Sequence, residues 1–419
     1  MKKFVSLIAL MVLLLSVIGV HAQDKVTLIL GSWRTEDVDG YGKMIALFEA
    51  SHPNVEVKFE PTLNTEYDAQ LRTALDGGAG PDLITCRPFD RALLLYQAGY
   101  LTDVTKLSGM EHYSDVAKSA WSTDDKSATY CVPMGAVLHG FIYNKDIFDQ
   151  VGVQPPRTES EFFAVLDKIK AAGITPLDIT TKDSWTTATM GFDNLWPNFA
   201  GGEPERQAII AGKAKFTDKG FVDVLTSLSK WAPYMPAGHE SIGYADAQQL
   251  FPLGQAAIYP SGSWEIPLFE SQADFKLGAF RPYQPDGADP KDCWLSDEVD
   301  IAITANAHSA HPDEAKAFLE WLTSQEFAQA FADNQPGFFP LADYKIDIKD
   351  PLAAEFVSWR QDCKSTIRIF DQFLSRGDPG GLQLALDNVY LMVQGKETPE
   401  DVAKKIQDGL DKWYKPPTS

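Results

Sequence analysis

The segment 26–85 constrains the fold more than any other part of the chain, because strand-like and helix-like apolar patterns alternate along it. Strands are predicted at 26–30, 55–59 and 82–85, and the second of them alternates like a half-exposed strand. A helix around 65–75 precedes the third strand. Another helix follows the first strand and has one apolar face, formed by Tyr41, Met44, Ile45 and Phe48. This β-α-β-α-β order predicts an α/β sheet with helices on its faces.

The stretch 251–265 carries a large aromatic ring on a tight turn. Its sequence predicts a helix end, a glycine turn at Gly254, a short buried strand and then the turn 261–263, which delivers Trp264. Glycine lets the backbone approach a ligand closely, so a ring at this place is suited to the wall of a cleft. The alternative is a core tryptophan that caps the strand, and the stretch alone does not separate the two.

The length and the N-terminus predict an exported protein of two domains or lobes. With 419 residues the chain can bury more than one core. Basic Lys2 and Lys3, an apolar run and the small-residue end 20–22 indicate a signal peptide over 1–22, cleaved near Gln23. The apolar run is short for a bilayer span, which disfavours a membrane anchor.

The charge of the chain limits its partners. The formal charge is −21, and loss of 1–22, which carries two lysines and no acidic residue, makes it −23. Nucleic acids and anionic membrane surfaces require cationic patches, so neither is expected as a partner. An acidic chain suits a neutral or cationic ligand, although we attribute most of this charge to a solvated surface without a role in binding.

Four cysteines, Cys86, Cys131, Cys293 and Cys363, remain after export. In an oxidising compartment they can form up to two disulfides in three full pairings. The sequence does not rank these pairings against each other or against buried free thiols. No pair has the CxxC spacing of a zinc site, and neither a metal nor a cofactor is expected.

Signatures of catalysis are absent from the sequence, whereas aromatic residues in loops are abundant. The chain has no HExxH, GxSxG, GxGxxG or phosphate-loop motif, and no residue is assigned a catalytic role. A pair of facing carboxylates, as glycosidases use, is not excluded among 58 acidic residues, but nothing points to one. In loops, rings can stack on the C–H faces of a sugar while polar groups bind its hydroxyls. The tryptophans in or beside predicted loops are Trp33, Trp185, Trp196, Trp264 and Trp294.

A series of short motifs extends in order over essentially the whole exported chain. They are FEASHPNV (48–55), GPDLI (80–84), VP (132–133), FIYNKDIF (141–148), EF (161–162), FT (216–217), GQAAI (254–258), SGSW (261–264), HPDEA (311–315), FLEW (318–321) and GKETPEDV (395–402). Each motif alone is weak, and their order and spacing carry the argument. In this series the chain resembles the extracellular solute-binding proteins of ABC transporters, in the carbohydrate-binding group that includes maltose-binding proteins.

The resemblance implies a two-lobe α/β fold of the type II periplasmic-binding-protein class, with the ligand cleft between lobes joined by crossing strands. Hinge closure would let both lobes contribute binding energy and let a transporter recognise the closed form. Crossings are expected near 134–137, 297–300 and 337–341. The expected N-terminal lobe is 23–136 and 300–338, and the expected C-terminal lobe is 137–299 and 339–419.

The resemblance also implies which residues line the cleft. Trp264 matches the position at which the family presents a sugar-stacking ring, and Glu265 adjoins it. Cys86 stands where family members carry an aromatic residue, which alters the expected stacking arrangement. The other residues expected to bind the ligand are Trp33, Glu36, Arg87, Trp185, Trp196, Trp294, Asp297, Phe338, Asp371 and Arg376.

The leading hypothesis is therefore an exported, monomeric, non-enzymatic protein that captures a mono- or oligosaccharide by hinge closure. It would act in the periplasm or outside the cell and deliver the sugar to a membrane-embedded ABC permease. One alternative is a secreted carbohydrate-active hydrolase. Another keeps the fold but binds a polyamine or other small cation, for which the acidic charge is an argument.

Overall fold

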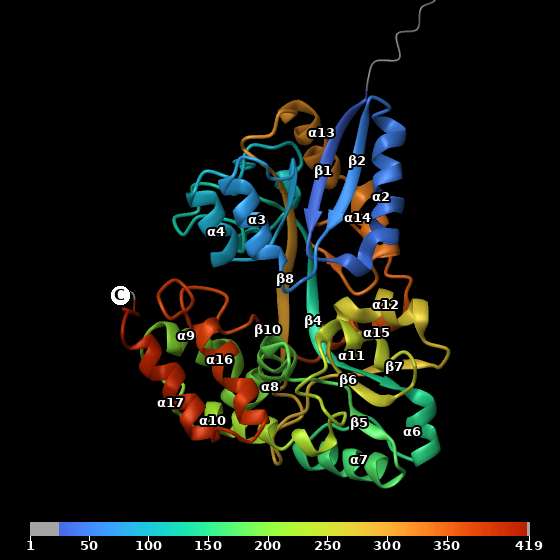
Figure 1. Ribbon diagram of the computed structural model, residues 1–419, viewed down its shortest axis with the longest axis vertical. Helices are drawn as coiled ribbons and strands as arrows, with labels where there is room; N and C mark the ends of the chain where they lie inside the picture. The colour runs from blue at the N-terminus through green and yellow to red at the C-terminus, as the bar shows by residue number, and fades with distance from the viewer. Residues whose placement is uncertain (1–24, 417–419) are drawn as a thin grey trace, which may run out of the picture.

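The computed structural model of the protein describes residues 25–416. The signal peptide expected at 1–22 lies outside these residues. In the described part of the chain, a sheet of ten strands runs through two lobes, in the order β2-β1-β3-β8-β4-β6-β5, with β10 paired to β8 and both β7 and β9 paired to β4 (Figure 1). The strands are β1 Val26–Ser32, β2 Val55–Pro61, β3 Leu83–Cys86, β4 Val132–Asn144, β5 Thr175–Leu177, β6 Ala256–Gly262, β7 Leu277–Phe280, β8 Trp294–Ala305, β9 Phe339–Pro340 and β10 Lys364–Thr366.

The N-terminal lobe, built on β1, β2 and β3, contains the predicted alternation of strands and helices. β1 pairs in parallel with β2 and with β3, and the connections carry α2 (Val38–Ser51) and α3 (Tyr67–Asp76). The predicted apolar face of α2 is buried, as expected for an amphipathic helix on a sheet. Helices α13 (Pro312–Leu322) and α14 (Gln325–Asn334) return from late in the sequence to cover the same lobe (Figure 1).

β4 and β8 are the long strands that join the lobes (Figure 1). The sequence at 131–133 and 138–145 predicts two extended pieces, whereas β4 is one continuous strand of 13 buried residues. Near its start β4 pairs with β8 and β9, and near its end with β6 and β7 of the C-terminal lobe. A Cβ at Gly135 would lie 2.7 Å from the ring of Phe331, so glycine lets the α14 side chain pack on the crossing strand.

The C-terminal lobe is built on β5, β6 and β7 and is rich in helices. Thr158 and Glu161 have the spacing of a capping box, and α7 (Glu159–Ala171) begins there, since the Thr158 side chain accepts a hydrogen bond from the Glu161 N–H. Its remaining helices, together with those of the other lobe, are α4 Asp90–Gln97, α5 Asp115–Ser119, α6 Lys145–Val151, α8 Asp193–Ala200, α9 Gly202–Ile210, α10 Lys219–Ser229, α11 Tyr244–Leu250, α12 Ile266–Gln272, α15 Pro351–Ser358, α16 Gly381–Val393 and α17 Pro399–Leu410.

Two local predictions for this lobe were wrong. Thr217 precedes a stretch with apolar residues at helical spacing and so predicts a helix that begins after it, whereas α10 begins after Asp218. The stretch 185–196 is helical rather than a loop, because a π-helical segment (Thr186–Phe192) leads directly into α8. A π-helix has a wider turn than an α-helix, so its apolar residues do not recur at the spacing used to find helices.

The lobe boundaries remain a proposal, and the structure moves one of them. The first two, at 136/137 and 299/300, fall inside β4 and β8. Beyond the third, at 338/339, the chain still contacts the N-terminal lobe: the Tyr344 hydroxyl donates to the Thr323 carbonyl at 3.1 Å, and Lys349 pairs with Asp333 at 2.6 Å. We therefore place the third boundary at the start of α15.

All four cysteines are paired. One disulfide, Cys86–Cys131, joins the end of β3 to the residue before β4, and the other, Cys293–Cys363, joins the residues that precede β8 and β10. The second disulfide therefore lies where the crossing strand β8 begins beside its neighbour β10, whereas the first links β3 and β4, the two strands on either side of β8. Over residues 25–416, none of the helices is both long and apolar enough to cross a membrane.

Candidate ligand-binding cleft

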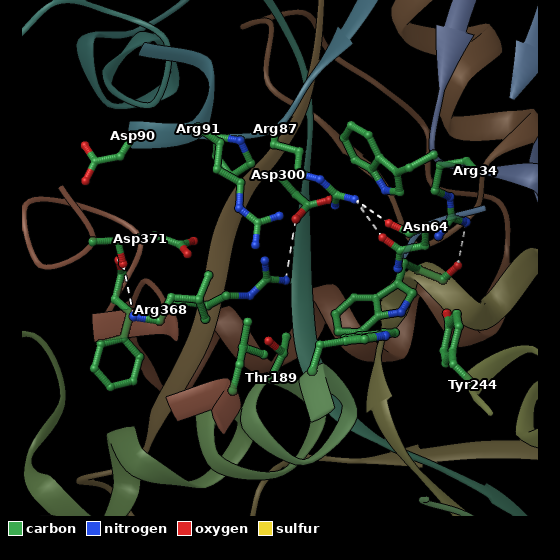
Figure 2. Close-up of a pocket in the computed structure, with 18 residues that line it drawn as sticks. Arg34, Asn64, Arg87, Asp90, Arg91, Thr189, Tyr244, Asp300, Arg368 and Asp371 are labelled. Carbon is green, nitrogen blue, oxygen red and sulfur yellow. Dashed lines mark hydrogen bonds and ion pairs between the residues drawn. The ribbon is translucent and has the colours of Figure 1, made fainter. Parts of the chain in front are cut away.

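The candidate site is a cavity of about 140 Å³ between the two lobes, beside the crossing strand β8 (Figure 2). We call it the interlobe cavity. Most of its lining lies on loops that follow strands or at the first turn of a helix, where side chains of α/β proteins converge on ligands. The N-terminal lobe contributes Trp33, Arg34, Asn64, Arg87, Pro88, Asp90 and Arg91, the crossing strand contributes Asp300, and the C-terminal lobe contributes Trp185, Thr189, Tyr244, Trp264, Arg368, Phe370, Asp371, Ser375, Leu382 and Leu386.

Five of the residues expected from the sequence line the interlobe cavity: Trp33, Arg87, Trp185, Trp264 and Asp371. They come from both lobes and from segments more than 300 residues apart. The structure therefore brings them together, and their contact with a ligand is a proposal.

Four further expected residues stand directly behind or beside the lining. Glu36 forms an ion pair with Arg34 at 3.0 Å, and the ring of Phe338 lies 4.9 Å from the same guanidinium. Glu265 is inaccessible to solvent and holds Trp264, and Arg376 pairs with Asp90. These side chains can act on a ligand only through the residues that they hold.

The other three expected residues lie away from the cavity. Trp196 is inaccessible in the core of the C-terminal lobe, where α8 turns its ring onto Phe221. The remaining two are at the start of β8. The ring of Trp294 packs on Gly202 and beneath Lys364, and the carboxylate of Asp297 pairs with Arg360. We leave Trp196, Trp294 and Asp297 out of the proposed site.

The ring of Trp264 is held in place by the backbone of the strand before it. β6 ends at Gly262, and a 3₁₀ turn at Ser263–Glu265 follows. A Cβ at Gly262 would lie 2.1 Å from the indole, so only glycine lets the ring fold back over the strand end. His139 of β4 contacts the indole edge-on, with ring centroids 5.0 Å apart. The ring is left 7% exposed, at the wall of the cavity.

The buried carboxylate of Glu265 connects the aromatic residues of this wall. It accepts hydrogen bonds from the Tyr244 hydroxyl at 2.7 Å, from Gln248 Nε2 at 2.8 Å and from Trp264 Nε1 at 3.2 Å. Trp185 then packs edge-on against Tyr244 at 4.6 Å. Burial raises the pKa of Glu265 to about 7, although the hydrogen bond from Tyr244 opposes the shift. The Glu265 carboxylate thus orients the rings of Tyr244 and Trp264 directly, and it orients the ring of Trp185 through Tyr244.

The opposite wall is formed by Trp33 and Arg87. The guanidinium of Arg87 lies 4.4 Å from the centre of the Trp33 ring, a cation–π geometry. Its other contacts are the Asp68 carboxylate, 2.7 Å from Nε, and the side-chain oxygen of Asn64, 2.7 Å from Nη2. Protein groups therefore occupy Nε and Nη2 of Arg87, and its guanidinium covers one face of Trp33. Only the other face of this ring is available to a ligand.

The floor of the cavity is a buried cluster of charges around Arg368. Its Nε lies 2.6 Å from Glu298 Oε2, and its Nη2 lies 3.5 Å from Asp300 Oδ1. Burial raises the pKa of Glu298 to about 7 against the opposing effect of Arg368. His139, 3.3 Å from Glu298, is neutral, because burial and then Arg368 lower its pKa well below the ordinary value.

Polar groups from both lobes face the centre of the cavity. Figure 2 shows Arg91 and Arg368 directing their guanidinium groups into the same central space from opposite lobes. Among residues 25–416, Asp371 Oδ2 has no hydrogen-bond partner and is shielded from solvent. Burial raises the pKa of Asp371 to about 7, while Arg368 lowers it. The cavity thus offers both donors and acceptors between aromatic walls.

Several lining residues were missed by sequence reasoning. Arg34 and Asn64 could have been found, because they follow β1 and β2, and the carboxyl ends of parallel strands meet at one edge of a sheet. For the others the sequence gives no local signal, because their elements reach the cavity only through tertiary packing. The missed residues with polar or aromatic side chains are Arg34, Asn64, Asp90, Arg91, Thr189, Tyr244, Asp300, Arg368, Phe370 and Ser375.

The site shows no arrangement for a metal. Across residues 25–416, histidine, cysteine and acidic side chains nowhere gather in a group of three or more that could hold an ion. Two of the three acidic side chains that line the cavity are paired instead with arginines, Asp300 with Arg368 and Asp90 with Arg376.

Two lobes joined by crossing strands, with a polar and aromatic cavity between them, define a type II solute-binding protein. A solved structure of the solute-binding protein RafE in complex with raffinose has the same fold, with a TM-score of 0.75 and 22% identity over 93% of this chain and 99% of that one. The model of the family described as bacterial extracellular solute-binding protein matches residues 32–329. The chain belongs to this family, and the resemblance and fold class predicted from the sequence are confirmed.

Two curated relatives span most of the chain. The multiple sugar-binding protein of Streptococcus mutans is 25% identical over 347 residues, which are 79% of each chain. The mannitol-binding protein of Pseudomonas aeruginosa is 26% identical over 339 residues, 75% of this chain and 72% of that protein.

Proposed function

We propose that the protein binds a neutral sugar or polyol in the interlobe cavity and delivers it to an ABC transporter permease. The relatives named for sugar or mannitol binding, and the raffinose complex of the same fold, support this ligand class. The family and its neighbours are binding proteins rather than enzymes, and we infer the same for this chain. Export by the predicted signal peptide and action as a monomer are parts of the proposal.

The observation that carries the ligand class is the mixture of charges at the centre of the cavity. Arg91 and Arg368 offer donors, whereas Asp371 offers a buried carboxylate oxygen without a partner. A hydroxyl group both donates and accepts, so neighbouring hydroxyls of one sugar can satisfy both kinds of group. Aromatic rings on two walls supply the flat apolar surface that C–H faces require.

The same observation argues against the charged ligand considered from the sequence. A polyamine would place its ammonium groups beside two guanidinium groups, and like charges in a site of low dielectric repel strongly. The acidic surface of the chain does not alter this local balance.

The volume of the cavity limits the size of the ligand. About 140 Å³ is well below the 300–1,000 Å³ typical of sites for drug-sized ligands. We therefore propose a ligand of one or two sugar rings, or a polyol of similar size.

A thermal-shift panel tests the proposal. Monosaccharides, hexitols, disaccharides, raffinose and polyamines are each added to the exported protein, and a ligand at 100 times its Kd should stabilise the fold by about 2.7 kcal/mol. Stabilisation by a small neutral sugar or polyol supports the proposal, and stabilisation by polyamines alone refutes it. Incubation with a panel of chromogenic glycosides checks the hydrolase alternative, which predicts release of the chromophore.

A further inference from the structure

The segment 367–376, which we call the strap, forms the part of the cavity wall that comes from the end of the chain. Four of its residues line the interlobe cavity: Arg368, Phe370, Asp371 and Ser375. The strap is held by the C-terminal lobe. It follows β10, which pairs with β8 and is preceded by the disulfide Cys293–Cys363, and Phe370 stacks on Phe216 at 5.1 Å.

The end of the strap reaches across to the N-terminal lobe. Arg376 Nε donates to Asp90 Oδ1 at 2.7 Å, and Nη1 and Nη2 donate to the two carboxylate oxygens of Asp124 at 2.7 and 2.9 Å. Asp90 is the first residue of α4 and itself lines the cavity, and Asp124 lies in the turn before β4. One guanidinium from the C-terminal lobe therefore uses three donors on two carboxylates of the other lobe, a fork that only arginine provides.

A second contact accompanies the ion pairs. Phe373 of the strap lines a surface pocket together with Met110, Asp124 and Thr129 of the N-terminal lobe. Its φ angle is +66°, in the left-handed region that a phenylalanine rarely adopts. A backbone of this kind persists where its surroundings hold it, and here the guanidinium of Arg376, itself paired with both carboxylates of the other lobe, lies 4.6 Å from the Phe373 ring.

We propose that Arg376 is a latch that holds the two lobes closed and fixes the strap residues against the ligand. When the lobes part, Arg376 must leave both carboxylates. The Asp90 side chain is 6% exposed in the closed arrangement. Asp90, which Arg376 contacts, lies on the same side of the cavity as Asp371 (Figure 2), so closure and the position of the unpartnered carboxylate are set together. This inference concerns lobe closure and does not depend on the identity of the ligand.

The test measures the distance between the lobes in the protein without ligand. All four native cysteines are in disulfides, so Val116→Cys and Leu253→Cys, at positions that are 73% and 70% exposed in opposite lobes, accept spin labels selectively. Arg376→Met keeps the apolar stem and removes the ion pairs. We expect a longer interspin distance and at least a fivefold fall in the ratio of closed to open molecules, the lower end of typical coupling between sites.

A matched control is available on the same lobe. Arg360 makes a two-donor ion pair with Asp297 inside the C-terminal lobe, and its side chain is 32% exposed against 29% for Arg376. Arg360→Met should leave the interspin distance unchanged. Asp124→Asn leaves the ion pair of Arg376 with Asp90, so it should lengthen the interspin distance in the same direction as Arg376→Met but by less.

The proposal is overturned if Arg376→Met leaves the distance distribution as in the parent protein. An equal shift in the Arg360→Met control also overturns it, because the effect would then follow from losing any such ion pair. Circular dichroism of each variant separates these outcomes from unfolding. Since no sugar is added, a failure of the proposed ligand class would not affect the result.

Discussion

Replacing Trp264 by alanine is expected to reduce both the stability of the fold and the affinity for the ligand, by amounts that can be measured separately. The side chain is 7% exposed, and truncating a buried tryptophan costs about 3–5 kcal/mol of unfolding free energy. A central aromatic residue of a binding site contributes about 2–4 kcal/mol to binding. At 1.4 kcal/mol per factor of ten, that is a loss of roughly 30- to 700-fold in Kd.

Trp196→Ala is the matched control for this prediction. Trp196 is inaccessible, lies in the same lobe and stacks on Phe221, but is absent from the cavity lining. We expect a similar loss of unfolding free energy and an unchanged Kd. Isothermal titration calorimetry with the sugar selected by thermal shift gives Kd, and urea unfolding gives stability. An equal change of Kd in the two variants, or no change for Trp264→Ala, would refute the assignment of Trp264 to the cleft wall.

Three further predictions follow from the buried carboxylates and the disulfides. The unfolding free energy should fall between about pH 4 and pH 8, because burial raises the pKa of Glu265, Glu298 and Asp371 to about 7 and the folded state therefore binds protons more tightly than the unfolded state. Denaturant unfolding at several pH values tests this, and an unfolding free energy that does not fall over this range would contradict it. Asp178→Asn should make the unfolding free energy fall less with pH, since Asp178 is inaccessible and burial raises its pKa to about 8. The variant should be more stable than the parent by several kcal/mol at pH 9, and an unaltered pH dependence would contradict this prediction. Replacing both Cys293 and Cys363 by serine should weaken sugar binding about tenfold or more in calorimetry, because this disulfide anchors the strap that lines the cavity. The same change at Cys86 and Cys131 should act mainly on stability, and equal effects of the two double variants on Kd would contradict the role of the Cys293–Cys363 disulfide.

The sequence predicted the alternation of strands and helices in the N-terminal lobe because each element there has a clear local pattern. The strands at 26–30 and 55–59 and the buried face of α2 are confirmed. The turn that delivers Trp264 was predicted for a similar reason, since its glycines are the residues that a tight backbone requires. Prediction failed at 185–196, where a π-helical segment does not follow the spacing of an α-helix.

The candidate site could be predicted only in part. Trp33, Arg87, Trp185, Trp264 and Asp371 were expected at the cleft and lie at the cavity. The sequence also marked Trp294 and Asp297 beside a predicted strand. It did not show that β8 begins at Trp294, that the Trp294 ring packs on Gly202 or that the Asp297 carboxylate pairs with Arg360. Which face of a segment meets the ligand depends on the neighbours it acquires on folding, and those neighbours are distant in sequence.

The sequence by itself determined the class of the fold, the family motifs and the aromatic turn at Trp264. These depend on residue spacing over ten or twenty positions, which short-range sterics and burial translate directly into structure. Only the tertiary structure decided the disulfide pairing, the charged cluster around Arg368, the hydrogen bonds to the Glu265 carboxylate and the contact of Arg376 with the other lobe. Each of these joins residues from separate elements that meet only through tertiary packing, and no local pattern encodes that packing.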